Sequence, residues 1–287
     1  MHRIVLLLFA CMLFAAGCLT AAPSQAEEQI RPVAPADAIP IFGGQATYSE
    51  LIGDATPDIC ANYSMGLVTI PPGNATLPHR LIGTTELVYV LSGTAEISCD
   101  NETVTVRKGE VVLLPESVLQ SIAAAGDTDL AYLTVIEPPF TDAIEVSGDG
   151  LAAIDTVTNG TPVVVAGPDD GIPWDAGTGG TVYTLANPVL MPKRGIAINY
   201  SVAYGELLPG GYVAYDRLNG SSDFIYVISG EVAIATPDGE RLRVPAGSGA
   251  FVPPGVMKET RNIAESATML VSFVDPVWTE EKTALWE

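Results

Sequence analysis

The sequence predicts an all-β protein built from two related domains, and three observations support this prediction. The 32-residue stretch Asn62–Gly93 recurs without a gap at Asn199–Gly230, with 12 identities. A repeat of this length indicates a duplicated domain. Short runs rich in Val, Ile, Leu and Tyr alternate with turns that contain Gly, Pro, Asn or Asp, a pattern typical of the strands of sandwiches and barrels. Beyond the N-terminal apolar run, no segment longer than ten residues keeps a helical periodicity.

The first 26 residues, 1–26, form a predicted export signal and the start of a tether. Arg3 precedes the uncharged apolar run Ile4–Gly17. This run is shorter than the stretch that a permanent transmembrane helix normally needs. The sequence Ala-Ala-Gly-Cys at its end resembles a lipobox and predicts lipidation of Cys18, whereas cleavage after Ala26 is the alternative. A polar tether rich in Pro and Ala follows over residues 20–37 and favours the lipid anchor. We therefore expect an exported protein, either extracellular or held at the cell surface by its N-terminus.

Charge and sequons limit the classes of function further. The formal net charge of −21 argues against a nucleic-acid partner, because phosphate binding requires clustered Lys and Arg. Six of the eight asparagines begin an N-x-S/T sequon, which chance does not easily explain. Use of these sequons for glycosylation explains them, and together with the lipobox-like start it favours an archaeal cell surface. The predicted acceptors are Asn62, Asn74, Asn101, Asn159, Asn199 and Asn219.

The strand-like runs divide the remaining chain into two units of ordinary domain size. The first unit is expected over residues 38–147 and the second over 181–278, and the Gly- and Asp-rich residues 148–180 are expected to connect them. The strands expected in the first unit include 67–70, 87–91, 102–106, 111–114 and 131–136. Those expected in the second unit include 224–228, 231–235, 241–244, 249–252 and 268–274.

Two cysteines, Cys60 and Cys99, remain in the folded part of the chain once the export signal is set aside. In an oxidising compartment, two thiols favour one disulfide, which would tie the segment before the first repeat to a strand of the first domain. Two buried thiols are the alternative. Neither cysteine has a second Cys or a His at metal-ligand spacing, so no zinc site is predicted here.

The repeat carries a pattern of spaced glycines that resembles the first motif of the cupin superfamily, G-x5-H-x-H-x(3,4)-E-x6-G. In the first copy its positions are Gly73, His79, Leu81, Glu86 and Gly93. The second cupin motif, G-x5-P-x-G-x2-H-x3-N, has its place at Gly109, Pro115, Ser117, Gln120 and Ala124. In the second copy the two motifs fall at Gly210, Asp216, Leu218, Asp223, Gly230 and at Gly247, Pro253, Gly255, Lys258, Asn262. The resemblance covers most of the mature chain and implies a bicupin, with two tandem double-stranded β-helix barrels of the jelly-roll class.

The resemblance also implies a possible metal site in the first barrel, because cupin metalloenzymes hold a metal ion with three His and one Glu. Residues at i and i+2 of a strand share a face, so His79 and Leu81 should both point into the barrel. His79 and Glu86 are good ligands and Gln120 is a weak one, while leucine stands where a further donor belongs. Two interpretations stay open. One is a single divalent transition metal held by His79, Glu86 and Gln120, and the other is a metal-free hydrogen bond between His79 and Glu86.

In the second barrel, Asp216, Asp223 and Lys258 replace three of the ligands. If these side chains converge as the motif implies, the Lys258 ammonium lies near the place of the cation and pairs with two carboxylates. Calcium would suit the oxygens, but the ammonium opposes a second cation. The prediction is a metal-free polar pocket for a small hydroxylated or charged ligand.

Three classes of function are compatible with these features. The leading hypothesis is a non-catalytic exported bicupin that binds a small molecule or has a structural role at the cell surface. The second is a metal-dependent enzyme that works at barrel 1 only and resembles cupin dioxygenases, isomerases or oxalate-degrading enzymes. The third is a homo-oligomeric surface-layer component, because strand-rich barrels associate through their edges. The sequence names no catalytic residue and no substrate, and it contains no nucleotide-binding or nucleophile motif.

Overall fold

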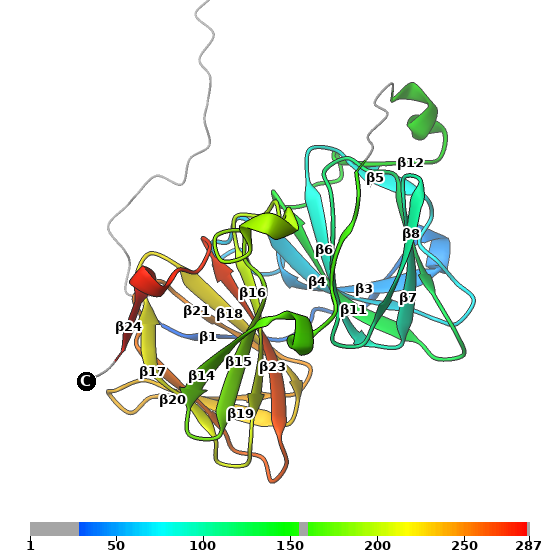
Figure 1. Ribbon diagram of the computed structural model, residues 1–287. Coiled ribbons are helices and arrows are strands. Elements are labelled where there is room, and N and C mark those ends of the chain that lie inside the picture. The colour runs from blue at the N-terminus through cyan, green and yellow to red at the C-terminus, as the bar shows by residue number, and fades with distance from the viewer. Residues whose placement is uncertain (1–28, 155–159, 286–287) are drawn as a thin grey trace, which may run out of the picture.

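The computed structural model describes residues 29–154 and 160–285, which form two β-barrels lying side by side (Figure 1). The predicted signal and tether over 1–26, the predicted lipid acceptor Cys18 and the sequon at Asn159 lie outside the described residues. Strands dominate the described chain, and its helices are short 3-10 turns. None of these described helices is long and apolar enough to cross a membrane. The predicted all-β class, with two tandem jelly-roll barrels, is confirmed.

Barrel 1 contains twelve strands in two sheets. The strands are β2 (Ile39–Ile41), β3 (Ala46–Ile52), β4 (Ser64–Ile70), β5 (His79–Leu81), β6 (Thr85–Ser92), β7 (Thr94–Cys99), β8 (Glu102–Arg107), β9 (Val111–Leu114), β10 (Gln120–Ala124), β11 (Leu130–Glu137), β12 (Glu145–Ser147) and β13 (Val163–Val165). The seven-stranded sheet has the order β13-β9-β6-β11-β4-β3-β2, and the five-stranded sheet has the order β12-β5-β10-β7-β8.

Barrel 2 repeats this arrangement strand for strand. Its strands are β1 (Arg31–Val33), β14 (Ile172–Gly177), β15 (Gly180–Ala186), β16 (Ser201–Leu207), β17 (Tyr212–Leu218), β18 (Ser222–Ser229), β19 (Glu231–Ala235), β20 (Arg241–Pro245), β21 (Gly249–Val252), β22 (Lys258–Asn262), β23 (Thr268–Asp275) and β24 (Thr283–Leu285). Their sheet orders are β1-β21-β18-β23-β16-β15-β14 and β20-β19-β22-β17-β24. The 3-10 turns are η2 (Phe42–Gly44), η3 (Gly148–Ala153), η4 (Pro168–Asp170), η5 (Pro192–Arg194) and η6 (Glu280–Lys282).

Each barrel takes an edge strand from the segment that precedes the other barrel in the sequence. Strand β1, drawn in blue in Figure 1, pairs antiparallel with β21 of barrel 2. Strand β13 pairs in the same way with β9 of barrel 1. The predicted connection 148–180 therefore contributes β13 to barrel 1 and β14 to barrel 2, and barrel 2 continues past the predicted 181–278 to β24. Barrel 1 is therefore a contiguous piece of the chain from β2 to β13, whereas barrel 2 combines β1 with β14 to β24.

The two seven-stranded sheets pack against each other through their outer faces. One hydrophobic cluster contains residues of both sheets, whereas each barrel interior has a cluster of its own. Strand β6 contributes side chains to two clusters. Leu87 and Tyr89 belong to the cluster shared by the two barrels, and Val88 and Val90 belong to the interior cluster of barrel 1. Because successive side chains of a strand point to opposite faces, such strands are apolar on both faces. This explains why they are continuous apolar runs in the sequence.

The repeated Asn-Tyr-Ser sequence makes reciprocal contacts between the barrels. The backbone N of Asn62 donates to the Asp275 carboxylate over 2.8 Å, and its Nδ2 donates to both carboxylate oxygens over 3.1 Å. In the reverse direction, the backbone N of Asn199 donates to Glu137 over 2.9 Å, and its side chain bonds the same carboxylate. Glu137 and Asp275 end the corresponding strands β11 and β23 and are both buried. Each barrel thus donates hydrogen bonds to the carboxylate that ends the corresponding strand of the other barrel.

The tyrosines of the two Asn-Tyr-Ser copies lie at the centre of this interface. The rings of Tyr63 and Tyr200 have centroids 5.4 Å apart and are fully buried. Their hydroxyls are the buried side-chain polar atoms of the described residues that lack a hydrogen-bond partner. Burial raises the pKa of both phenols, and the carboxylate of Asp275 adds to the shift in each. Both hydroxyls therefore stay protonated at ordinary pH.

Two of the sequon asparagines take part in these contacts. The Nδ2 atom of Asn62, which would carry a glycan, donates to Asp275, and the side chain of Asn199 bonds Glu137. Both asparagines are exposed, and glycosylation at them stays a prediction. Of the other described sequons, Asn74 donates to the carbonyl of Gln45 over 3.3 Å. The side chains of Asn101 and Asn219 are exposed.

The predicted disulfide between Cys60 and Cys99 is wrong, because no disulfide joins them in the structure. Cys99 is fully buried in the interior cluster of barrel 1, where its Sγ donates to the carbonyl of Gly160 over 3.6 Å. Cys60 is exposed in the loop between β3 and β4, whose residues Ile59 and Ala61 pack on the shared cluster between the barrels. The two thiols thus belong to different layers of the molecule. Burial, aided by nearby carboxylates, raises the pKa of Cys99 to about 11.

The contact between Asn62 and Asp275 should contribute measurably to stability. A double-mutant cycle with Asn62→Ala and Asp275→Ala isolates their side-chain coupling, which we expect to be about 1.5–3 kcal/mol, as for hydrogen bonds to a charged group. The free energy of unfolding in urea provides the measurement. A matched cycle with the exposed Asn101→Ala in place of Asn62→Ala should give a coupling near zero. Equal couplings in the two cycles would contradict the assigned role.

Candidate functional site

The three predicted site residues of barrel 1 come together in the structure. His79 begins β5, Glu86 lies on β6, and Gln120 begins β10, where it is the register partner of His79. All three side chains are buried. The Gln120 Nε2 atom lies 3.2 Å from His79 Nε2 and also donates to Glu86 Oε2. The amide of Gln120 therefore bridges the imidazole and the carboxylate.

The neighbouring contacts determine the tautomer of His79. Its Nδ1 atom lies 2.8 Å from the carbonyl oxygen of Leu77, which can only accept a hydrogen bond. Nδ1 therefore carries the proton, and Nε2 presents its lone pair to the amide hydrogen of Gln120. The second amide hydrogen goes to Glu86, whose other carboxylate oxygen accepts from Thr134 over 2.7 Å. The single lone pair that His79 could offer to a metal ion is therefore already used.

These residues do not fit the metal centre that the cupin resemblance implies. Leu81 is buried beside His79 on β5 and supplies no donor atom. The amide nitrogen of Gln120 donates hydrogen bonds and so takes the place of a cation. The ring of Phe42 covers the imidazole with centroids 5.0 Å apart. Across the described residues, no group of three or more His, Cys, Asp or Glu side chains is placed to hold a metal ion.

In barrel 2, Asp216, Asp223 and Lys258 also converge. They lie on β17, β18 and β22, at the positions that correspond to His79, Glu86 and Gln120. Lys258 Nζ donates to the two carboxylate oxygens of Asp216 over 3.0 and 3.1 Å, and it lies 3.3 Å from Asp223 Oδ2. The remaining oxygen of Asp223 accepts from the hydroxyl of Ser272. The ammonium thus lies between two carboxylates.

Burial and charge act in opposite directions on this triad. Burial by itself would lower the pKa of Lys258, but Asp216 and Asp223 outweigh that effect and raise it above its usual value. Burial raises the pKa of Asp223, and the attraction of Lys258 opposes the shift. Because the ammonium is so strongly favoured, Lys258 stays charged through the neutral range and cannot serve there as a base.

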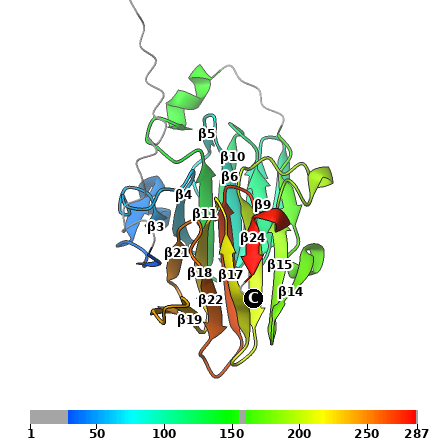
Figure 2. The same ribbon diagram turned by 90° about the vertical axis from the view of Figure 1, so that its left-hand side faces the viewer.

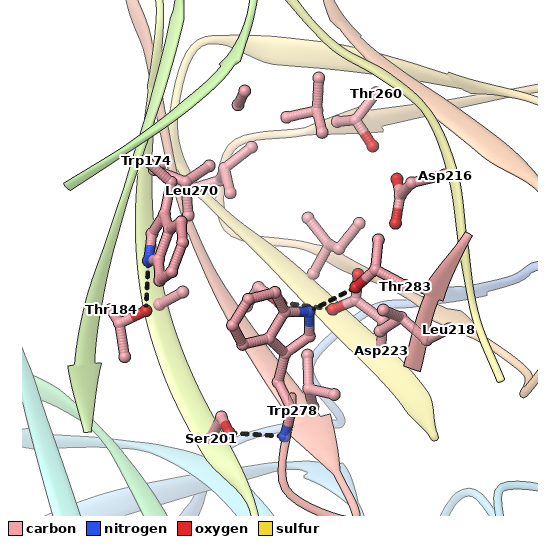
Figure 3. Close-up of a pocket in the computed structure, with 18 of the residues that line it drawn as sticks. Trp174, Thr184, Ser201, Asp216, Leu218, Asp223, Thr260, Leu270, Trp278 and Thr283 are labelled. Carbon is pink, nitrogen blue, oxygen red and sulfur yellow. Dashed lines mark hydrogen bonds between the residues drawn. The ribbon is translucent and has the colours of Figure 1, made fainter. Parts of the chain in front are cut away.

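A cavity of about 570 Å³ opens beside this triad. Apolar side chains form most of its wall, together with the rings of Trp174 and Trp278, whose centroids lie 5.3 Å apart at 65° (Figure 3). The indole N–H of Trp174 donates to Thr184 and that of Trp278 donates to Thr283, each over 2.9 Å. The backbone N of Trp278 is held by Ser201, the last residue of the second Asn-Tyr-Ser copy. The cavity wall is therefore tied to the interface between the barrels.

The C-terminal strand completes one side of this cavity. Strand β24 pairs antiparallel with β17, and Figure 2 shows it running beside that strand. It brings Thr283 and Leu285 to the wall, and Asp216 is the register partner of Leu285. Barrel 1 has the same arrangement, because β12 pairs with β5 and places Ser147 opposite His79.

The two barrels differ in how their interiors are filled. Strand pairing places Tyr48 and Tyr132 beside Val68 in barrel 1, and it places Val182 and Leu270 beside Gly205 in barrel 2. The larger side chains of barrel 1 are Tyr48, Val68, Ile122 and Tyr132, and their counterparts at the wall of the cavity are Val182, Gly205, Thr260 and Leu270. The same backbone therefore encloses a filled interior in one barrel and an open one in the other.

Sequence reasoning finds the charged part of this site and misses its aromatic part. Trp174 lies in the connection and Trp278 lies beyond the last core strand, so neither belongs to a motif. A signal does exist for Trp278. Its counterpart in barrel 1 is Phe140, whose backbone N bonds Ser64 over 3.0 Å as that of Trp278 bonds Ser201 over 2.8 Å. Extending the repeat beyond the second glycine motif reveals this aromatic position.

Removing the ammonium of Lys258 should destabilise the protein in a pH-dependent way. Lys258→Met leaves two buried carboxylates without a counter-ion, which should cost roughly 3–5 kcal/mol near neutral pH. The pKa of Asp223, already raised by burial, should then rise further. A raised carboxyl pKa stabilises the folded state below its unfolded value of about 4 and loses that contribution as pH rises through the folded value. Urea unfolding should therefore show a smaller deficit near about pH 5 than near about pH 8.

The exposed Lys108→Met serves as the control for this substitution and should leave the free energy of unfolding nearly unchanged. If Lys258→Met lost the same stability at both pH values, the carboxylates would not carry the charge assigned to them.

Metal content provides a separate test of barrel 1. Because Gln120 takes the free lone pair of His79 and Leu81 supplies no donor, we expect the purified protein to carry far less than one transition-metal ion per chain. The double variant with Leu81→His and Gln120→His supplies the ligands that are missing from the motif and should gain an ion. Mass spectrometry of metals after zinc incubation and gel filtration measures both. A near-stoichiometric ion in the wild type that disappears in His79→Ala would overturn this expectation.

Comparison with known proteins identifies a family match in each barrel. The Cupin domain family matches residues 66–136 and 203–274, one match in each barrel. An uncharacterized protein of Methanocaldococcus jannaschii is 30% identical over 77 residues, which cover 27% of this chain and 62% of that protein. The match thus spans less than two thirds of that relative.

Solved structures resemble both barrels together. Oxalate decarboxylase from Bacillus subtilis superposes with a TM-score of 0.66 at 16% identity, covering 84% of this chain and 74% of that one. The oxalate decarboxylase formate complex from Lactobacillus farciminis gives a TM-score of 0.66 at 14% identity, with 87% and 86% covered. Procruciferin, an 11S globulin from Brassica napus, gives 0.66 at 13% identity, with 87% and 84% covered. At these identities the likeness shows the fold alone. With a cupin domain in each half and a bicupin fold overall, this chain belongs to the cupin superfamily.

Proposed function

We propose that the protein is a non-catalytic bicupin that binds a small organic molecule in the cavity of barrel 2. The observation that carries this proposal is the cavity itself, about 570 Å³ with two tryptophans in its wall and a buried Lys–Asp–Asp triad beside them. Pockets for small ligands typically have about 300–1,000 Å³ and combine apolar walls with a few fixed polar groups. The cavity has both properties.

The state of the chemically active groups supports a binding role over a catalytic one. In barrel 2, Lys258 is held in its charged form by two carboxylates, so it is neither a nucleophile nor a base near neutral pH. In barrel 1, the lone pair of His79 is used by Gln120. Neither barrel therefore pairs a nucleophile with an available base.

The reactions of the structural neighbours do not transfer to this chain. Decarboxylases and a globulin share this fold, and function depends on the residues of a site. Here leucine and glutamine replace two of the four ligands expected in barrel 1, and aspartate and lysine replace ligands in barrel 2. The divergence of the ligand positions and the opening of the second barrel both favour a binding protein.

We extend the proposal to its location, as an exported protein anchored through Cys18. The support is the N-terminal apolar run, the lipobox-like sequence and the polar tether after it. The exposed sequons Asn101 and Asn219 are compatible with glycosylation in such a compartment. Cleavage after Ala26 would give a secreted protein with the same binding role.

Filling the cavity with the side chains that barrel 1 uses should abolish binding and leave the fold intact. Thr260→Ile and Leu270→Tyr copy the corresponding residues Ile122 and Tyr132. A thermal-shift screen of sugars, organic acids, amines and other small molecules against the wild type should find compounds that raise the unfolding midpoint. The same compounds should give no shift with the double variant, because the added atoms occupy their space.

The control for this experiment is Thr105→Ile, the same type of substitution at an exposed position of β8. It should retain every shift seen with the wild type. Shifts that persist in the filled variant, or a wild type that responds to no compound, would contradict the proposed function.

A further inference from the structure

The charge of the cavity restricts the ligand that it can take. Of the described residues that line it, Lys258 is the only basic one, whereas Asp175, Asp216 and Asp223 carry carboxylates. Asp175 lies exposed on β14, next to Trp174, and the other two are paired with Lys258. The cavity wall therefore carries three negative charges against one positive charge. The net charge of −21 on the whole chain adds to the negative electrostatic potential at the cavity.

The ammonium of Lys258 is already paired with two carboxylates. Three carboxylate oxygens lie at 3.0, 3.1 and 3.3 Å from Nζ, two from Asp216 and one from Asp223. An anion placed there would meet both carboxylates at close range, which is costly in an interior of low dielectric constant. The carboxylates still have capacity, because each has about four lone-pair sites and the contacts above use two on each. With two carboxylates on one ammonium, the triad carries excess negative charge and can still accept hydrogen bonds from a ligand.

The tryptophans suit a cation as well. Both indole N–H groups are used by threonines, so the rings meet the cavity with their carbon surfaces (Figure 3). The face of an indole attracts an ammonium group, by about 0.5–2 kcal/mol depending on how far the cation is desolvated. Two indoles at 65° to each other present surfaces in two directions around one cavity. Apolar walls, aromatic faces and excess carboxylate are the elements of a site for an organic cation.

We infer that the ligand of barrel 2 is a small organic cation, an alkyl-substituted or quaternary ammonium compound. This inference rests on the proposed binding function and specifies its ligand class. The alkyl groups would lie against the tryptophans and the aliphatic wall, and the positive charge would lie toward Asp216 and Asp223. A neutral or anionic molecule of the same shape would fill the same volume and lose the electrostatic part of the binding energy.

Three probes of nearly equal shape test this inference directly. Choline carries the positive charge, 3,3-dimethylbutan-1-ol is its neutral counterpart, and 3,3-dimethylbutanoate carries a negative charge. Titrations followed by tryptophan fluorescence and by calorimetry should show choline binding at least about tenfold more tightly than the alcohol, which corresponds to about 1.4 kcal/mol. The carboxylate should bind most weakly. Added salt should weaken choline binding and leave the alcohol nearly unaffected.

Variants separate the charge from the shape of the cavity. Asp175→Asn removes a rim charge without touching the buried triad, and it should weaken choline while leaving the alcohol unchanged. Asp216→Asn should have a larger effect of the same kind, and Trp278→Phe should weaken both probes and choline more. Thermal unfolding shows which variants keep their fold. If a buried substitution unfolds the protein, the exposed Asp175→Asn still tests the effect of charge on choline binding.

The outcomes distinguish this inference from the proposed function. If the alcohol or the carboxylate binds as tightly as choline, or if Asp175→Asn leaves choline affinity unchanged, the cationic ligand class is wrong and the binding function stands. If none of the three probes binds but other compounds shift the unfolding midpoint in the thermal screen, the inference fails and the function again stands. If no compound of any charge binds, both fail.

Discussion

The reciprocal contact between the two barrels is the constraint on which the rest of the structure depends. Each copy of Asn-Tyr-Ser uses its asparagine to bond an acidic residue at the end of the other barrel's last core strand. The rings of the two tyrosines pack at 48° to each other at the centre, and each serine hydroxyl accepts a hydrogen bond from the backbone of the segment that leaves its own barrel. Strand β1 adds a further link, because it precedes barrel 1 in the sequence and pairs with β21 of barrel 2. Both copies of the repeat keep Asn-Tyr-Ser because each asparagine bonds a corresponding acidic residue in the other barrel.

The interface also explains why the cavity has its present walls. Ser201 positions Trp278, and the chain then turns back to place β24 against β17. In barrel 1 the corresponding serine holds Phe140, and the chain returns as β12. The two barrels therefore share one framework and differ in the side chains that it carries. Four smaller or more polar residues open barrel 2, and the network around Gln120 closes the polar centre of barrel 1.

The sequence was sufficient for the fold and for part of the site. The spaced glycines and the strand-like runs identify the barrels, and the motif spacing correctly brings together His79, Glu86 and Gln120. The short strands that carry much of the site, β5 and β10, do not appear as apolar runs because polar and apolar residues alternate in them. The disulfide was expected from the number of cysteines, and this number contains no information on which layer each thiol occupies.

Local patterns determine the architecture of this protein, because turn glycines and strand periodicity act over a few residues and are visible in the sequence itself. Tertiary structure alone decided three matters: which carboxylate each repeated asparagine meets, that β1 crosses to barrel 2, and that two tryptophans from outside the motifs border one cavity. Each of these depends on residues far apart in the chain, such as Asn62 and Asp275. Their contact follows from how the two sheets pack, and no local spacing encodes it.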